Sequence, residues 1–115
     1  MAITRHEPAK ILSKVVEANG TVMTAGITAD DRNLDVKGQT AQILETIDRL
    51  LALCGSDKSK VLFATIWVSD IRYRDEMNVA WLEWVDGDNL PARACIEARL
   101  ADPKLLVEIA VTAVK

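Results

Sequence analysis

Arg93, Cys95 and Glu108 are the residues whose side chains could carry chemistry in an otherwise apolar C-terminal region. Residues 90–111 predict two strands joined by a short turn at 102–104. Because side chains alternate across a strand, Arg93 and Cys95 share one face of the first strand, and Glu108 interrupts the apolar residues of the second. An Arg side chain can hold a carboxylate through two hydrogen bonds, and a carboxyl group can orient a water molecule or transfer its proton. The pattern is therefore compatible with a small site for an anionic substrate.

The same residues also have a purely structural interpretation. Arg93 and Glu108 on adjacent strands could form a cross-strand ion pair worth about 0.2–1 kcal/mol, and the pattern alone favours this interpretation. Cys95 could act as a nucleophile only with a base nearby. The single histidine, His6, lies far away in the sequence, in an N-terminal segment that we expect to be mobile. We therefore expect Cys95 to be a half-buried packing residue.

Composition limits the classes of protein to consider. The chain has 115 residues, half of them hydrophobic, and a net charge of −3, with a pI of about 5.1. We therefore expect one domain over residues 1–115 with an aliphatic core. The negative charge argues against a nucleic-acid surface, and no apolar run reaches the roughly 20 residues of a membrane span.

The first residues and the cysteines favour the cytoplasm as the compartment. The opening sequence MAITRHEPAK lacks the apolar stretch of a signal peptide. Cys54 and Cys95 have no spacing typical of a disulfide framework or a metal site. We therefore expect a reduced cytoplasmic protein without a metal.

The elements that must position the candidate residues follow from periodicity and turn signals. Asn-Gly at 19–20 is a strong hairpin signal, Gly55 suits the left-handed residue after a helix, and Asp70 is a suitable helix N-cap. In chain order, the sequence predicts strands at 11–18 and 21–25, a polar loop at 28–35, a helix at 36–54, a central strand at 60–69, a helix at 72–85 and two strands within 90–111.

The order ββαβαββ predicts an α+β fold with one mixed sheet and two helices on one face. Trp81 and Trp84 would then be packing or interface residues. We expect the other face of the sheet to carry Phe63, Trp67, Cys95 and many aliphatic side chains. Such a face needs a cover, and another subunit is the natural candidate.

Longer motifs give the chain a family resemblance. They are TAGI at 24–27, DVKGQTAQILETIDRLL at 35–51, IWVSDIRYRDEMNVAWLEW at 66–84 and LPARACIEARLADPKLLVEIAVTA at 90–113. The most specific features are Pro-Ala-Arg at the start of a strand, a Cys two residues after that Arg, and Val-Glu-Ile on the next strand. Over nearly its whole length the chain resembles the reactive-intermediate deaminase (Rid) family.

The resemblance implies a chorismate-mutase-like fold and a homotrimer with a ligand cleft at each subunit interface. It also implies hydrolysis of small 2-imino or 2-enamino acids, such as 2-aminoacrylate and 2-iminobutanoate, to 2-keto acids and ammonia, with no metal or organic cofactor. By match to the family motif, Arg93 would bind the substrate carboxylate, and Glu108 would orient the water and act as acid or base. Cys95 would contribute its backbone, and Asn78 would support the cleft.

The chain departs from the best-known deaminases of the family at two cleft positions. Those deaminases carry a Tyr in the first strand and a Ser just before the hairpin glycine. Aligning on Gly26 places Leu12 and Ala25 there, so both hydroxyl groups are missing. The resemblance therefore implies a divergent subgroup with a less polar pocket and a different preferred substrate.

Two alternatives to the deaminase stay open. The protein could be a regulatory module that binds small keto or amino acids through Arg93 without turning them over. An RNA-directed role is the weakest alternative, because some family members carry ribonuclease labels while this chain is acidic and lacks a basic cluster.

Overall fold

A single seven-stranded mixed sheet organises the computed structural model, which describes residues 1–115. The strand order is β1-β2-β3-β7-β5-β6, and the short β4 also pairs with β7. The strands are β1 (Ile3–Pro8), β2 (Ser13–Ala18), β3 (Thr21–Thr24), β4 (Ile27–Thr28), β5 (Val61–Val68), β6 (Ala92–Glu97) and β7 (Val107–Val114).

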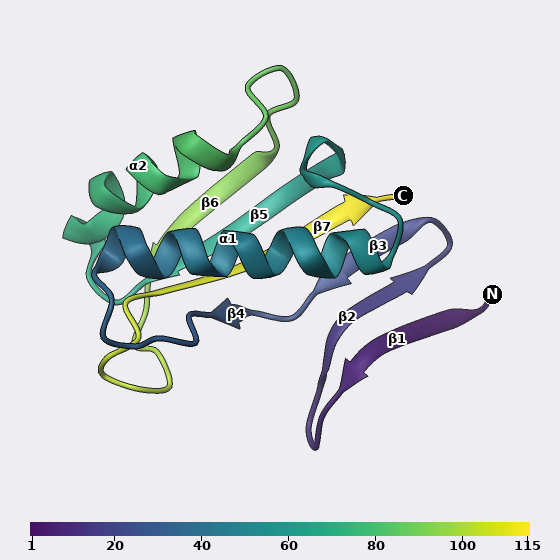
Figure 1. Cartoon of the computed structure of the whole chain (residues 1–115), viewed down its shortest axis with the longest axis horizontal. Helices are drawn as coiled ribbons and strands as arrows, with labels where there is room; N and C mark the ends of the chain where they lie inside the picture. The colour runs from purple at the N-terminus through teal and green to yellow at the C-terminus, as the bar shows by residue number, and fades with distance from the viewer.

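Two helices, α1 (Val36–Leu53) and α2 (Arg74–Trp84), lie on the same side of this sheet (Figure 1). Short 3-10 turns, η1 (Lys58–Lys60) and η2 (Ile71–Tyr73), precede β5 and α2. The α+β prediction with both helices on one face is therefore confirmed. Neither helix is long and apolar enough to cross a membrane.

The predicted hairpin forms β2 and β3. Asn19 and Gly20 adopt positive φ values of 53° and 77°, which a two-residue turn between twisted strands requires. The N-terminal segment, however, is not mobile as we expected. It forms β1, in which His6 lies opposite Val15 of β2. Its residues are mostly exposed and polar, so this edge strand lacks the apolar alternation that would have predicted it.

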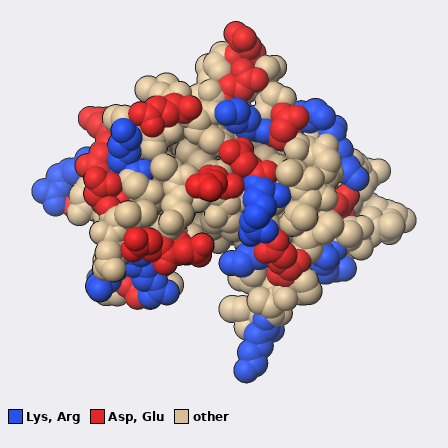
Figure 2. All heavy atoms as spheres, in the orientation of Figure 1, with Lys and Arg blue, Asp and Glu red and all other residues tan.

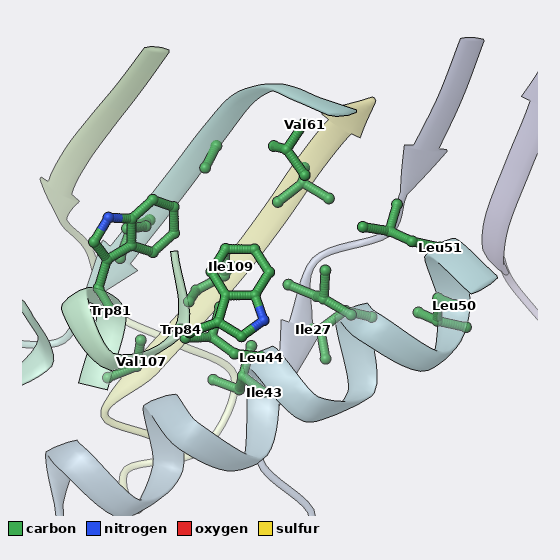
Figure 3. Close-up of a cluster of buried hydrophobic side chains, with 14 of the residues drawn as sticks. Ile27, Ile43, Leu44, Leu50, Leu51, Val61, Trp81, Trp84, Val107 and Ile109 are labelled. Atoms are coloured by element: carbon green, nitrogen blue, oxygen red, sulfur yellow. The ribbon is translucent and has the colours of Figure 1, made fainter. Parts of the chain in front are cut away.

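The helix predicted at 36–54 ends one residue earlier, at Leu53. Its N-cap is Asp35, whose carboxylate accepts a hydrogen bond from the Gly38 amide at 2.7 Å. Gly55 follows with a φ of 72°, as a left-handed residue after a helix should. The apolar stripe of α1 packs on the sheet with side chains from α2, β4, β5 and β7 (Figure 3).

The second predicted helix splits in two. Asp70 accepts a hydrogen bond from the Arg72 amide at 2.9 Å and therefore caps the 3-10 turn η2, which continues into α2. Met77, Ala80, Trp81 and Trp84 form the buried side of α2. The two tryptophan rings pack at 5.4 Å between centroids, as predicted for packing residues.

The two C-terminal strands do not form the adjacent pair that we expected. β5 lies between them, parallel to β6 and antiparallel to β7. In this central position β5 pairs along both of its edges, although only its helix side is covered within the chain. The loop 98–106 therefore crosses over β5 instead of making a hairpin. Arg93 and Glu108 lie on strands that are not neighbours, and the interpretation of a cross-strand ion pair is wrong.

The sheet face opposite the helices carries exposed apolar side chains. Met23, Phe63 and Ile96 expose between 42% and 51% of their surface there. Cys95 does not belong to this face as expected, because it lies opposite the buried Ile66 on the helix side. A second subunit as the cover of this face stays a prediction.

Candidate functional site

Arg93 lies on β6 at the edge of the sheet, on the face that α2 covers. Its neighbour across the parallel ladder is Ala64, which is fully buried beneath the helices. The guanidinium Nη1 donates a hydrogen bond to Asn78 Oδ1 at 2.7 Å, and Cζ lies 5.2 Å from the centroid of the Trp81 ring. Two neutral groups of α2 therefore hold the guanidinium in place.

The surroundings of Arg93 leave its charge available. The chain forms seven ion pairs, and Arg93 belongs to none of them. Beside it is an open hollow of about 330 Å³ whose lining residues are Asn78, Trp81, Leu82, Leu90, Pro91 and Arg93. The hollow is thus a pocket with one fixed cationic group and an apolar wall, which suits a small carboxylate with an aliphatic side chain.

Cys95 is a half-buried residue that packs against the hydrophobic core. No histidine can activate it, because His6 lies on β1 at the opposite edge of the sheet and contacts Glu17. Its backbone is more informative. The amide of Ala98 donates to Val68 O of β5, so by alternation the N–H and C=O of Cys95 point away from β5, toward the open sheet edge.

Glu108 lies on β7, on the face that the helices leave open. Its neighbours along the strand, Val107 and Ile109, are fully buried on the helix side, and Trp67 lies opposite it on β5. The carboxylate leans over Gly26, where an added Cβ would come within 2.2 Å of Oε2. Glu108 takes part in no ion pair within the chain. The Glu108 carboxylate can therefore occupy this position only because Gly26 has no side chain.

Ala25 lies beside Gly26 and therefore close to Glu108, whereas Leu12 lies in the turn that precedes β2. The Ala25 amide donates to Lys14 O at 2.8 Å, so Ala25 follows directly on the last pair between β2 and β3 and adjoins Gly26. Leu12 is 43% exposed in the turn between β1 and β2. This turn projects beyond the sheet at the bottom of Figure 1.

The candidate residues thus form two groups within one chain. Arg93, Asn78 and Cys95 lie together on the helix-covered side of edge strand β6. Glu108 lies on the other face of the sheet, with Gly26 beneath it. A side chain cannot reach through a packed sheet, so one copy of the chain cannot place Arg93 and Glu108 on the same small ligand.

The roles of Gly26 and Trp81 were not predicted from the sequence. Gly26 served only to align the chain, although a glycine inside a strand pattern often marks a close approach by another group. Trp81 was correctly predicted to pack, but its ring also supports the Arg93 guanidinium. The sequence carried no signal for that contact, because it depends on how α2 lies over β6.

A larger hollow, of about 720 Å³, lies under the loop that connects β6 to β7. Arg99 lines it, but the carboxylate of Glu97 is already occupied there by the amide of Ile71 at 2.9 Å. Glu97 and Arg99 do not form an ion pair with each other within the chain. This hollow has no guanidinium held by two neighbouring side chains, as Arg93 is held by Asn78 and Trp81 in its own pocket.

Comparisons with known proteins agree over the whole chain. The endoribonuclease L-PSP family model matches residues 3–115. A RutC family protein from Haemophilus ducreyi is 44% identical over 111 residues, which is 96% of this chain and 95% of that protein. A RutC family protein from Escherichia coli is 37% identical over 113 residues, covering 98% of both chains.

Solved structures give the same result. The crystal structure of a YjgF family protein from Neisseria meningitidis is 44% identical and superposes with a TM-score of 0.97 over 100% of this chain and 96% of that one. A Rid family protein of unknown function from Yersinia pestis is 26% identical, with a TM-score of 0.92 over 99% of this chain and 100% of the other. The chain therefore belongs to the endoribonuclease L-PSP family, together with relatives that carry the names RutC, YjgF and Rid.

Proposed function

We propose that the protein hydrolyses small 2-imino or 2-enamino acids to 2-keto acids and ammonia. The observation that carries this proposal is the Arg93 guanidinium, which Asn78 and Trp81 hold without neutralising its charge. A fixed, unpaired guanidinium beside an apolar hollow suits the carboxylate and the short aliphatic side chain of such a substrate.

The reaction needs one water molecule and two proton transfers. Water adds its oxygen to the C2 carbon of the imine, and a proton goes to the imine nitrogen. The C–N bond of the resulting carbinolamine then breaks, the hydroxyl proton is lost, and the C2=O bond of the keto acid forms as ammonia leaves. A carboxylate can take the proton from the water and return it to the departing nitrogen, and this is the role that we assign to Glu108.

The placement of the two groups has a consequence for the assembly. Because Arg93 and Glu108 lie on opposite faces of one sheet, we propose that a cleft between two copies combines Arg93 of one copy with Glu108 of its neighbour. The exposed apolar residues Met23, Phe63 and Ile96 are suited to cover such an interface. The family resemblance predicts three copies around closed symmetry.

The substrate preference follows from the walls of the pocket. Leu12 and Ala25 replace the hydroxyl groups of the best-known deaminases, and Leu82 and Leu90 expose 72% and 67% of their surface beside the hollow. We propose that the preferred substrate is an imino acid with an apolar side chain, and that the backbone edge at Cys95 supplies further hydrogen bonds.

The first experiment measures ammonia and keto-acid release from freshly generated 2-iminobutanoate. Arg93→Ala should abolish turnover, and Arg93→Lys should restore only part of it because a lysine lacks the planar fork. Arg74→Ala is the matched control, since Arg74 is exposed and its weak contact with Asp75 is 3.7 Å long. Full turnover by Arg93→Ala would remove the proposal.

A mixing experiment tests the cleft between copies. Arg93→Ala and Glu108→Gln should each be inactive alone, and unfolding and refolding them together should restore activity. Random mixing leaves about one quarter of the clefts with both wild-type residues. The double variant Arg93→Ala/Glu108→Gln, mixed with wild type, is the control for simple dilution. A mixture as inactive as its components would show that the two residues do not share a cleft.

The same assays distinguish the alternatives. Binding of 2-ketobutyrate that depends on Arg93, without turnover of any imino acid, would favour the regulatory binder. Salt-sensitive RNA binding would favour the role that the family's endoribonuclease description suggests. The surface gives little support for that role, because the face in Figure 2 mixes acidic and basic side chains and the net charge is −3.

A further inference from the structure

A second polar cluster lies where β1, β2 and the end of α1 meet, at the opposite sheet edge from Arg93. His6, Glu17 and Cys54 bring one imidazole, one carboxylate and one thiol within 4.8 Å of one another. His6 Nε2 and Glu17 Oε2 are 2.7 Å apart, and these side chains are 24% and 14% exposed. Cys54 is only 2% exposed. The cluster therefore has a buried end at Cys54 and a partly exposed end at His6 and Glu17.

Lys115 completes the cluster from the C-terminal end of the chain. Its Nζ lies 2.7 Å from the other carboxylate oxygen of Glu17, and its side chain is 48% exposed. The hydrogen bonds from Lys115 and His6 lower the pKa of Glu17 to about 2. Burial, with the adjacent carboxylate of Glu17, raises the pKa of the Cys54 thiol to about 11. Cys54 is therefore a poor nucleophile and a poor redox sensor by itself.

We propose that His6, Glu17 and Cys54 form a binding site for a divalent zinc ion. Imidazole, carboxylate and thiolate are the three ligand types that zinc takes in proteins, and bond lengths of about 2.0–2.3 Å place tetrahedral ligand atoms about 3.3–3.8 Å apart. The three side chains need to shift by only about 1 Å from their present spacing to reach that geometry. A water molecule would take the fourth position.

Charge balance explains how the cluster accommodates the ion. Zinc favours the thiolate form of a coordinating cysteine, so the Cys54 proton leaves for solvent as the metal binds. Glu17 and the thiolate then balance the two positive charges of zinc. Lys115 is no longer needed beside Glu17, and its half-exposed side chain can move into water.

The site would tie together parts of the chain that are far apart in sequence. β1 is an edge strand that pairs only with β2. A metal bound by His6 of β1 and by Cys54 at the end of α1 would fix this strand to the helix layer. The proposal concerns a different region from the Arg93 pocket and does not depend on the deaminase function.

The test uses Co²⁺ as a spectroscopic substitute for zinc. Wild-type protein, freed of metals and kept reduced, should bind one Co²⁺ per chain with a thiolate-to-cobalt charge-transfer band in the near ultraviolet, and Zn²⁺ should displace it. His6→Gln and Cys54→Ser should each lose the band. Cys95→Ser is the matched control, because Cys95 is the only other cysteine and lies at the far edge of the sheet. It should keep the band.

Lys115→Ala sharpens the test. Removing a competing cation from the site should tighten Co²⁺ binding by about fivefold. If Cys54→Ser does not fold, His6→Gln decides the question, because His6 lies on an exposed edge strand. The proposal is overturned if wild type shows no charge-transfer band, if the band survives in His6→Gln, or if Cys95→Ser removes it.

Discussion

The two charged groups of the candidate site are held in different ways. The Arg93 guanidinium is held by two contacts, a hydrogen bond to the amide oxygen of Asn78 and packing over the ring of Trp81. The Glu108 carboxylate, by contrast, lies in the space that a side chain at position 26 would fill, and Gly26 leaves this space free. Elsewhere in the chain, charged groups neutralise each other, as Asp70 and Arg72 do with an Nε to Oδ1 distance of 3.0 Å.

This difference indicates how each half of the site can fail. The position of Arg93 is set by side chains that can be exchanged one at a time, so substitutions around it should weaken binding gradually. The position of Glu108 depends on a single space, so filling that space should remove its function at once. The following predictions test this contrast, starting with the largest expected effect.

Gly26→Ala should reduce turnover about as much as Glu108→Gln, by about 10²-fold or more, because the new methyl group displaces the Glu108 carboxylate that we propose as the acid and base. The fold should survive, since the displaced atoms are the far end of a flexible side chain. Gly87→Ala is the control, because no atom lies within 4 Å of a Cβ there. Steady-state kinetics with 2-iminobutanoate and a thermal melt check both parts. Unchanged turnover in Gly26→Ala would refute the role of Glu108.

Asn78→Asp should raise KM by about tenfold, because a carboxylate at this position pairs with the Arg93 guanidinium and competes with the substrate. The value of kcat should change less, since Glu108, the proposed acid and base, is untouched. Asn33→Asp, in an exposed loop, adds the same charge away from the site and should leave KM as it is. An Asn78→Asp variant with wild-type KM would mean that Arg93 does not bind the substrate carboxylate.

Leu12→Tyr should lower KM by about two- to tenfold relative to Leu12→Phe, because the two variants differ only in one hydroxyl that can hydrogen-bond to the substrate. Leu12 is 43% exposed and its turn can accept a ring. Equal KM values for the two variants would place Leu12 outside the cleft.

Asp70→Asn should flatten the acid dependence of stability without changing the cap itself. The side-chain hydrogen bond from Arg72, followed by the backbone bond, lowers the pKa of Asp70 from 3.8 to about 2. A lowered pKa stabilises the fold above pH 3.8, and this contribution is lost as the pH falls toward 2. Denaturant unfolding of both proteins between these pH values measures the difference, which should vanish at the acid end. Parallel pH curves for the two proteins would contradict the assignment.

Most of the fold could be predicted from the sequence because its signals were local. The Asn19-Gly20 turn, the stripe of α1 with Gly55 after it, and the Asp70 cap each depend on residues near in sequence. The misses have two causes. The pairing of β6 with β5 is set by long-range packing for which a short window carries no signal. β1 is an exposed, mostly polar edge strand without the apolar alternation that predicts a strand.

The candidate site shows the same limit. Its residue types were identified through the family motif, but their separation onto two faces depends on which side of the sheet each side chain points to. Arg93 of β6 pairs with the buried Ala64 and therefore points to the helix side. Glu108 of β7 lies between the buried Val107 and Ile109 and therefore points to the other side. The alternation along each strand was visible in the sequence. Which face of β6 matches which face of β7 could be known only from the structure, in which β5 lies between them. The cluster of His6, Glu17 and Cys54 had no sequence signal, because its ligands do not follow a metal-binding spacing.

The central place of β7 has a consequence for how the protein is made. This strand pairs with β3 and β4 on one side and with β5 on the other, and it follows all the other strands in chain order. The nascent chain can form its N-terminal hairpins and its parallel pair early, but no ladder joins them until β7 has been made. Until then, the edges of β3 and β5 stay open to other chains. A protein truncated before residue 107 would consist of two unjoined half-sheets.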